Sequence, residues 1–287
     1  MFTSAPHDPR LPRTGGPMLL TLSTKPNETL SPVLGRVLII DSSQSSVRML
    51  TELLHNIWPG KTRTASTTIS GLSIAQSVDP QLIFVEYADE GLDGLAFTRK
   101  LRRSEFSCRK APVIMVTAQA TPASIMAARD CGVHEFLRKP YTTKDLTRRI
   151  EAVTRQPRGW IEAVGYVGPD RRRFNSAEYR GARKRQADST QNGLMQALKI
   201  VASAVHAVEE DPAQARRSLD AQMVELRRDA EARGDKALAA ATEALQDYLS
   251  RVASGEESLT KAGIEALAAR LLTFMPKSAD AKARSAA

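Results

Sequence analysis

The sequence predicts an α/β fold with a doubly wound, five-stranded parallel sheet, followed by an all-α helical bundle. Between residues 36 and 154, short apolar runs alternate with helical patterns, as in sheets built from right-handed βαβ units. Beyond residue 154 the composition changes, first to a basic stretch and then to an alanine-rich segment almost free of aromatic residues. A chain of 287 residues is long enough for two domains, each with its own core.

Four short apolar runs in the first segment each lead to a polar residue. They cover residues 36–40, 82–85, 112–116 and 135–138, and they lead to Asp41, Glu86, Thr117 and Lys139, respectively. Helical patterns follow, with apolar residues at Val47, Leu50, Leu53 and Leu54, at Leu95, Phe97 and Leu101, at Ile125, Met126 and Ala128, and at Leu146 and Ile150. Because parallel strands end at one edge of the sheet, we expect the four polar residues to converge there.

Four landmarks in this segment fall in a characteristic order. They are the run Val37-Leu38-Ile39-Ile40-Asp41, the spacing from Glu86 to Asp93-Gly94, the triplet Val116-Thr117-Ala118 and the stretch from Gly132 to Pro140. With these landmarks, residues 36–154 resemble the receiver domain of two-component response regulators, a CheY-like domain with a flavodoxin-like fold. The resemblance covers a little under half of the chain.

The resemblance implies a phosphorylation pocket, and two of its parts are altered here. In the family an aspartate accepts a phosphoryl group, an acidic pair holds Mg²⁺, a lysine neutralises the phosphoryl oxygens and a hydroxyl hydrogen-bonds them. The phosphoacceptor position holds Glu86, and the acidic pair is reduced to Asp41 followed by Ser42. Thr117 and Lys139 supply the hydroxyl and the amine. We therefore expect an atypical pseudo-receiver.

Three interpretations of Glu86 remain open. Its side chain is longer than that of Asp by one C–C bond, roughly 1.5 Å, which moves the carboxylate away from the geometry of in-line transfer. In the first interpretation, a permanent pair with Lys139 holds the domain in one state, independent of phosphorylation. In the second, the pocket keeps some response to a metal or a small phosphodonor; a Mg²⁺ site through Asp41 would be weak, so no cofactor is expected. In the third, Glu86 has no signalling meaning.

The sequence also predicts the role or position of four further residues in this segment. Phe136 lies three positions before Lys139, where the family has an aromatic residue that reports on the switch, and it is either that residue or a core side chain. His134 has no second metal-type residue at a suitable spacing, so an edge or surface position is expected. Cys108 and Cys131 are too few for a disulfide framework and predict reduced, buried thiols.

A basic linker is expected over residues 155–191. Nine Arg and Lys residues against three acids give residues 154–185 a net charge of +6, and residues 179–185 echo the Tyr, the Gly and the basic pair of residues 166–172. Guanidinium groups beside a tyrosine suit phosphates or acidic side chains. A solvated tether that packs a tyrosine on the receiver, a contact for an acidic protein surface, and a site for nucleic acid or a cyclic nucleotide remain alternatives. The bases concerned are Arg171, Arg172, Arg173, Arg183, Lys184 and Arg185.

Residues 192–275 predict a bundle of four helices joined by short loops. The small side chains give it a modest core, so a homodimer or docking on a partner is expected. A phosphotransfer role is disfavoured because the residues after His206 lack the expected lysine and glycine, and DNA binding is disfavoured by the net charge of −2 over residues 186–287. The predicted helix boundaries are Asp211 with Pro212, Gly234, Asp235, Gly255 and Ser258.

The two ends of the chain carry weaker patterns. Residues 1–35 are expected to be a disordered leader, with Met18 as an alternative start, and residues 276–287 a flexible tail. No apolar stretch approaches the ~18 residues of a membrane span, so a cytoplasmic protein without membrane contact is expected.

Together with the patterns, the resemblance to receiver domains implies a non-enzymatic bacterial signalling protein of the two-component, phosphorelay type. In the favoured interpretation its receiver acts independently of phosphorylation through contacts with a histidine kinase or a downstream regulator. One alternative is a response regulator gated by phosphorylation and Mg²⁺, with a helical output domain. Another is a binder of nucleic acid or nucleotides through the basic linker, although nucleic acid is not the favoured partner.

Overall fold

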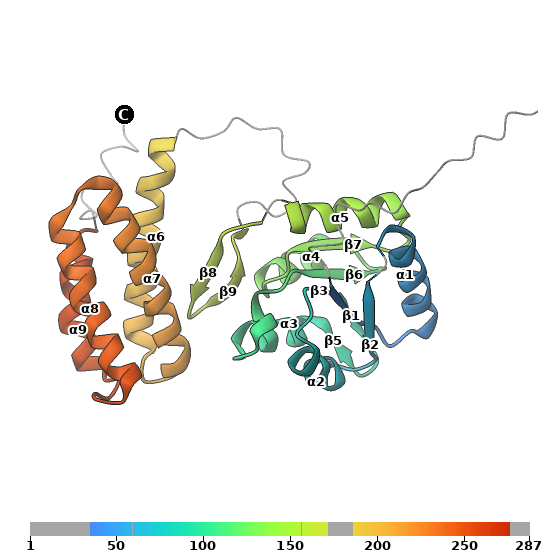
Figure 1. Cartoon of the computed structure of the whole chain (residues 1–287), viewed down its shortest axis with the longest axis horizontal. Helices are drawn as coiled ribbons and strands as arrows, with labels where there is room; N and C mark the ends of the chain where they lie inside the picture. Colours follow the sequence, from blue (N-terminus) through green and yellow to red (C-terminus); the bar gives the residue numbers. More distant parts are fainter. Residues whose placement is uncertain (1–34, 59, 156, 172–185, 276–287) are drawn as a thin grey trace, which may run out of the picture.

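We describe the protein from a computed structural model, in which residues 35–58, 60–155, 157–171 and 186–275 are described, with side chains from residue 193 onward in the last range (Figure 1). The predicted leader up to residue 34, with Met18, lies outside the described residues. So do the tail after residue 275 and the linker bases Arg172, Arg173, Arg183, Lys184 and Arg185.

The first half of the chain contains a five-stranded parallel sheet with the strand order β2-β1-β3-β6-β7. This confirms the doubly wound fold predicted from the sequence. No apolar run marked β2 because it is an edge strand in which only Ala65 is buried. The strands are β1 (Arg36–Ile40), β2 (Lys61–Ala65), β3 (Leu82–Glu86), β6 (Val113–Thr117) and β7 (Glu135–Arg138).

Helices cover both faces of this sheet. They are α1 (Gln44–Ile57), α2 (Thr68–Val78), α3 (Gly94–Arg103), α4 (Pro122–Asp130) and α5 (Thr143–Arg155), with a short 3-10 helix η1 (Ser107–Lys110) after α3. Side chains alternate along each strand, so Val37 and Ile39 pack with α1 and α5, whereas Leu38 and Ile40 pack with α2, α3 and α4.

Three side chains of this half test the sequence predictions. Cys108 and Cys131 are free and buried, as predicted, and burial raises the pKa of each thiol to about 11. The prediction for Met126 is wrong, because its side chain is 48% exposed while Ala128 of the same helix is fully buried.

A β-hairpin follows α5, within the region predicted as a linker. Its strands are β8 (Trp160–Ala163) and β9 (Tyr166–Pro169), which pair in antiparallel fashion. Tyr166 is buried and its hydroxyl donates to the Pro169 carbonyl at 2.6 Å. A smaller antiparallel pair, β4 (Ala88–Asp89) and β5 (Leu92–Asp93), follows β3.

Four helices form the C-terminal part: α6 (Gln186–Ala207), α7 (Pro212–Arg233), α8 (Lys236–Ser254) and α9 (Lys261–Leu272). They lie alongside one another around an apolar core, and the hairpin lies between them and the sheet (Figure 1). Asp211 and Asp235 cap α7 and α8 as predicted, and Gly234 and Gly255 end these helices in the left-handed region, with φ of +65° and +79°. The prediction that Ser258 opens the fourth helix is wrong, because Thr260 is the N-cap of α9.

In the part of the chain that the structure describes, no helix combines the length and the apolar character needed to cross a bilayer.

Candidate functional site at the carboxyl ends of the strands

The sheet brings three of the predicted pocket residues into direct contact. Asp41 follows β1, Glu86 ends β3 and Lys139 follows β7, and both carboxylates are buried. The Lys139 Nζ lies 2.9 Å from Asp41 Oδ2 and 2.5 Å from Glu86 Oε2, so one ammonium bridges the two acids. The same nitrogen also lies 3.2 Å from the Ser46 hydroxyl in the first turn of α1.

The remaining carboxylate oxygens of this site are also occupied by hydrogen-bond donors. Asp41 Oδ1 accepts the Ser43 N–H at 2.9 Å, and Glu86 Oε1 accepts the Tyr87 N–H at 3.1 Å. Mg²⁺ prefers hard oxygen ligands in tight octahedral geometry, and both acids that could bind it are held by Lys139. Among the described residues, no three His, Cys, Asp or Glu side chains group around a metal position. The residues present therefore do not fit the metal that the resemblance implies.

The electrostatics of the site reflect two acids that share one base. Burial raises the pKa of Glu86, and the hydrogen bond and charge of Lys139 offset only part of that effect, while the charge of Asp41 adds to it. Burial lowers the pKa of Lys139, but its contacts with Glu86 and Asp41 outweigh burial and raise it overall. Lys139 is thus held as an ammonium at neutral pH.

Two further predicted pocket residues lie at the rim. The Ser42 hydroxyl donates to Asp89, which lowers the pKa of that carboxyl. Thr117 ends β6, is buried, and its hydroxyl accepts the Gln119 N–H at 3.1 Å. The Ser42 hydroxyl is therefore engaged by Asp89 of β4, and the Thr117 hydroxyl by Gln119 of its own loop.

The turn after β3 fixes the backbone of Glu86. Asp93 caps α3 by accepting the Ala96 N–H at 2.8 Å. A Cβ at Gly94 would lie only 2.1 Å from the Glu86 carbonyl oxygen, so α3 can begin this close to β3 only with glycine at that position.

Phe136 and His134 both lie inside the domain. Phe136 is 6% exposed and packs in the apolar cluster under α2, α3 and α4, which is a core position. His134, predicted at an edge or the surface, directly precedes the edge strand β7, but a surface position is wrong because the ring is buried. Its Nδ1 accepts from Arg102 Nη2 at 3.2 Å and from the Val113 N–H at 3.3 Å.

Sequence reasoning missed the buried polar contacts beside the hairpin. No sequence pattern marked Arg102, yet it is 1% exposed and its guanidinium lies 5.3 Å from the centre of the Trp160 ring. Burial lowers its pKa to about 10, so it remains charged at neutral pH. Of the predicted linker bases, Arg171 is the one that the structure describes; it stacks on Tyr166 at 4.3 Å and pairs with Asp130 at 3.0 Å.

The sequence of this segment matches a known family, and the parallel sheet with its strand order agrees with that match. Residues 37–151 match the family model of the response regulator receiver domain. This segment is a receiver domain. The match ends before the hairpin and the bundle, so it gives no family for α6 to α9.

Relatives of this segment are bacterial signalling proteins. The chemotaxis protein CheY-3 of Vibrio cholerae is 24% identical over 118 residues, which cover 41% of this chain and 90% of that protein. The cyclic di-GMP phosphodiesterase response regulator RpfG of Xanthomonas campestris is 32% identical over 114 residues, but these cover only 30% of its length and 39% of this chain. A putative response regulator from Chloroflexus aurantiacus has a similar structure, with a TM-score of 0.40 and 21% identity over 43% of this chain and 99% of that one.

Proposed function

We propose that this protein is a two-component signalling protein whose receiver domain acts independently of phosphorylation, through contacts with other proteins. The observation that supports this most directly is the bridge from Lys139 to both Asp41 and Glu86. The resemblance implies that this lysine meets a phosphoryl group when the domain switches. In this structure Glu86, at the acceptor position, already contacts Lys139.

Phosphorylation of Glu86 would first have to break buried contacts. Glu86 would leave both Lys139 and the Tyr87 N–H, and the ammonium would keep Asp41 and Ser46. Separating a buried ion pair costs several kcal/mol when one charge loses its partner. The pairing therefore favours a single state of the pocket.

The proposal includes a non-enzymatic role in the cytoplasm. Its partners would be other signalling proteins, either a histidine kinase or a downstream regulator, and the helical bundle is the part that we propose contacts them or a second copy of the chain. On this proposal nucleic acid is not a partner. Arg171, the linker base that the structure describes, is paired with Asp130 and stacked on Tyr166.

The test compares the full-length protein with its Glu86→Asp variant. Each is titrated with Mg²⁺ and beryllofluoride, a mimic of a bound phosphoryl group, while ¹H–¹⁵N NMR spectra and sedimentation velocity are recorded. We expect the wild-type spectra to stay unchanged and the Asp variant, with its shorter side chain, to respond. A wild-type response at millimolar Mg²⁺ would refute phosphorylation independence and support a gated response regulator.

A second variant checks that the assay can detect a switch. Ser42→Asp restores the second acid of the pair, so Ser42→Asp combined with Glu86→Asp rebuilds both altered parts of the pocket. Ser42→Asp alone is the matched control, because it keeps the Lys139–Glu86 contact. We expect a response only in proteins that carry Asp at position 86.

A further inference from the structure

The receiver domain and the bundle meet through one buried carboxylate on the hairpin. Glu162 of β8 is 4% exposed. Its carboxylate accepts from Arg109 Nη2 of η1 at 2.6 Å, from Gln214 Nε2 of α7 at 3.0 Å and from Trp160 Nε1 at 2.8 Å. One side chain thus ties the receiver, the hairpin and the bundle together.

The face of α7 that meets the hairpin is polar. Gln214, Ser218 and Gln222 recur every four residues and so form one stripe, with exposed fractions of 0%, 0% and 6%. The Gln222 amide also reaches the Glu162 carbonyl oxygen at 3.4 Å. Water can replace hydrogen bonds of this kind, so separating the stripe from the hairpin costs far less than separating an apolar face of the same size.

The buried residues of the bundle core all lie within residues 194–271, and from the hairpin only the partly buried Val164 packs against them. On α7, Leu219 and Met223 are buried in the apolar cluster that all four helices share. The polar stripe lies on a different face of the same helix, with Gln222 directly beside Met223 in sequence. The bundle can therefore leave the hairpin with its apolar core intact.

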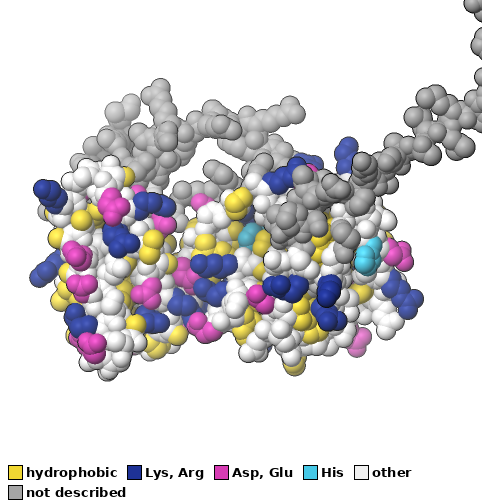
Figure 2. Space-filling view, viewed as in Figure 1, with side chains coloured by type: hydrophobic (Ala, Val, Ile, Leu, Met, Phe, Trp, Pro, Cys, Tyr) yellow, Lys and Arg dark blue, Asp and Glu magenta, His cyan; other side chains and the backbone are white. Residues whose placement is uncertain are grey.

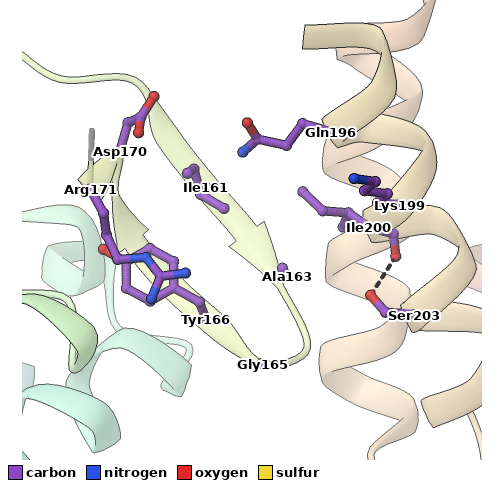
Figure 3. Close-up of a pocket in the computed structure, with 10 residues that line it drawn as sticks. All are labelled: Ile161, Ala163, Gly165, Tyr166, Asp170, Arg171, Gln196, Lys199, Ile200 and Ser203. Atoms are coloured by element: carbon purple, nitrogen blue, oxygen red, sulfur yellow. Dashed lines mark hydrogen bonds between the residues drawn. The ribbon is translucent and has the colours of Figure 1, made fainter. Parts of the chain in front are cut away.

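Packing between the hairpin and the bundle is incomplete. A cavity of about 590 Å³ lies between the hairpin and α6, with Ile161 and Ile200 on opposite walls (Figure 3). A second cavity of about 300 Å³ shares both residues and extends to Trp160 and Gln222. Permanent interfaces are packed as densely as protein interiors and are mostly apolar. Among the described residues, this one combines the polar stripe with a single apolar contact, Val164 of the hairpin turn on the bundle core, and it leaves space.

Charged pairs surround this contact. Arg103 of α3 lies 3.1 Å from Asp211 at the start of α7, and Arg217 of α7 pairs with Glu105. Figure 2 shows basic and acidic side chains next to one another where the two halves meet. The Arg103–Asp211 pair is exposed and adds little affinity. The Arg217 side chain is only 18% exposed and also donates to the Arg103 carbonyl at 3.2 Å, so it adds to the restraint that the buried Glu162 contacts supply.

We propose that this contact is a separable joint closed by Glu162. In the closed arrangement the hairpin covers the Gln214–Ser218–Gln222 stripe, and in the open arrangement the stripe is exposed to solvent. The receiver and the bundle each keep their fold in both arrangements. The contacts of the joint include none of the residues of the Lys139 pocket. This proposal can therefore be tested separately from the proposed function.

The test measures the distance between the two halves in the full-length protein. Spin labels are placed at Glu52→Cys on α1 and Glu243→Cys on α8, both exposed positions, while the buried native cysteines with pKa values of about 11 escape labelling. Electron–electron double resonance should give one narrow distance for the otherwise wild-type chain. Glu162→Ala leaves Arg109 without its carboxylate and should raise the open population about a hundredfold, seen as a second, longer distance. Gln214→Ala should raise it about tenfold.

The controls separate opening from unfolding. Glu151→Ala removes a partly exposed acid of α5 that pairs with Arg155, away from the joint, and should reproduce the wild-type distance. Circular dichroism, followed through thermal unfolding, reports whether both halves stay folded. A distance in Glu162→Ala equal to that of the wild type would overturn the proposal. Loss of either fold in that variant would also overturn it, because the contact would then be part of a core.

Discussion

Two buried glutamates of this chain have similar surroundings but opposite electrostatic balances. Glu86 is 7% exposed and Glu162 is 4% exposed, and each accepts a hydrogen bond from a basic side chain. Burial raises the pKa of Glu86, the hydrogen bond and charge of Lys139 offset only part of that effect, and the charge of Asp41 adds to it. Burial acts in the same direction at Glu162, but the hydrogen bonds from Arg109, Gln214 and Trp160 outweigh it and lower the pKa.

The opposite pKa shifts of the two glutamates show that the donors available to each carboxylate, rather than burial alone, decide whether a buried acid is stable as an anion. The receiver pocket holds two acids around one base and is therefore crowded with negative charge. The joint holds one acid among three donors and is electrostatically satisfied. Changes in the two places should consequently have different effects on stability.

The largest expected effect comes from removing the shared base. Lys139→Ala leaves Asp41 and Glu86 buried without their cation and should lower the free energy of unfolding by about 3 kcal/mol at pH 7. A carboxyl group whose folded-state pKa lies above its unfolded value gains stability as the pH falls. The deficit should therefore shrink between pH 7 and pH 5, as urea denaturation at both values would show.

The matched control for this variant is Lys144→Ala, an exposed lysine of α5. It should leave the free energy of unfolding unchanged within about 0.5 kcal/mol. Equal effects of the two substitutions would mean that Lys139 does not stabilise the two acids.

The same substitution at both glutamates tests whether their contributions to stability differ. Glu86→Gln removes a charge from the crowded pocket and leaves Lys139 with Asp41, so stability should stay equal or rise within about 1 kcal/mol. Glu162→Gln weakens charge-assisted hydrogen bonds from several donors and should cost about 2 kcal/mol. Thermal and urea unfolding of both variants at neutral pH measure the difference. If Glu86→Gln proved the more costly of the two, the account of the shared base would be wrong.

The same two regions show how far the sequence alone could lead. Asp41, Glu86 and Lys139 each follow or end a strand, and parallel strands end at one edge, so their convergence could be predicted from local patterns. Glu162 gave no such signal, because a lone acid in a basic segment resembles an ordinary linker residue. Its burial depends on Arg109 and Gln214, which are 53 and 52 residues away in the chain. Contacts between distant segments that follow no repeat cannot be derived from one sequence.

His134 illustrates that limit and supplies the smallest of the expected effects. From the sequence it resembled a surface histidine, whereas burial and the charges of Arg102 and Arg158 lower its pKa well below the usual 6.5. The folded protein therefore holds a neutral ring, while the unfolded chain binds a proton below about pH 6.5. Stability should fall as the pH drops below that value, by at most about 1.4 kcal/mol per pH unit from this residue.

In His134→Gln, whose amide oxygen can accept the same hydrogen bonds but does not titrate, urea unfolding between pH 7 and pH 5.5 should show a shallower dependence of stability on pH. Parallel slopes for the variant and the wild type would show that the ring binds a proton as readily in the folded protein as in the unfolded chain. Burial and the neighbouring cations would then not lower the pKa of His134.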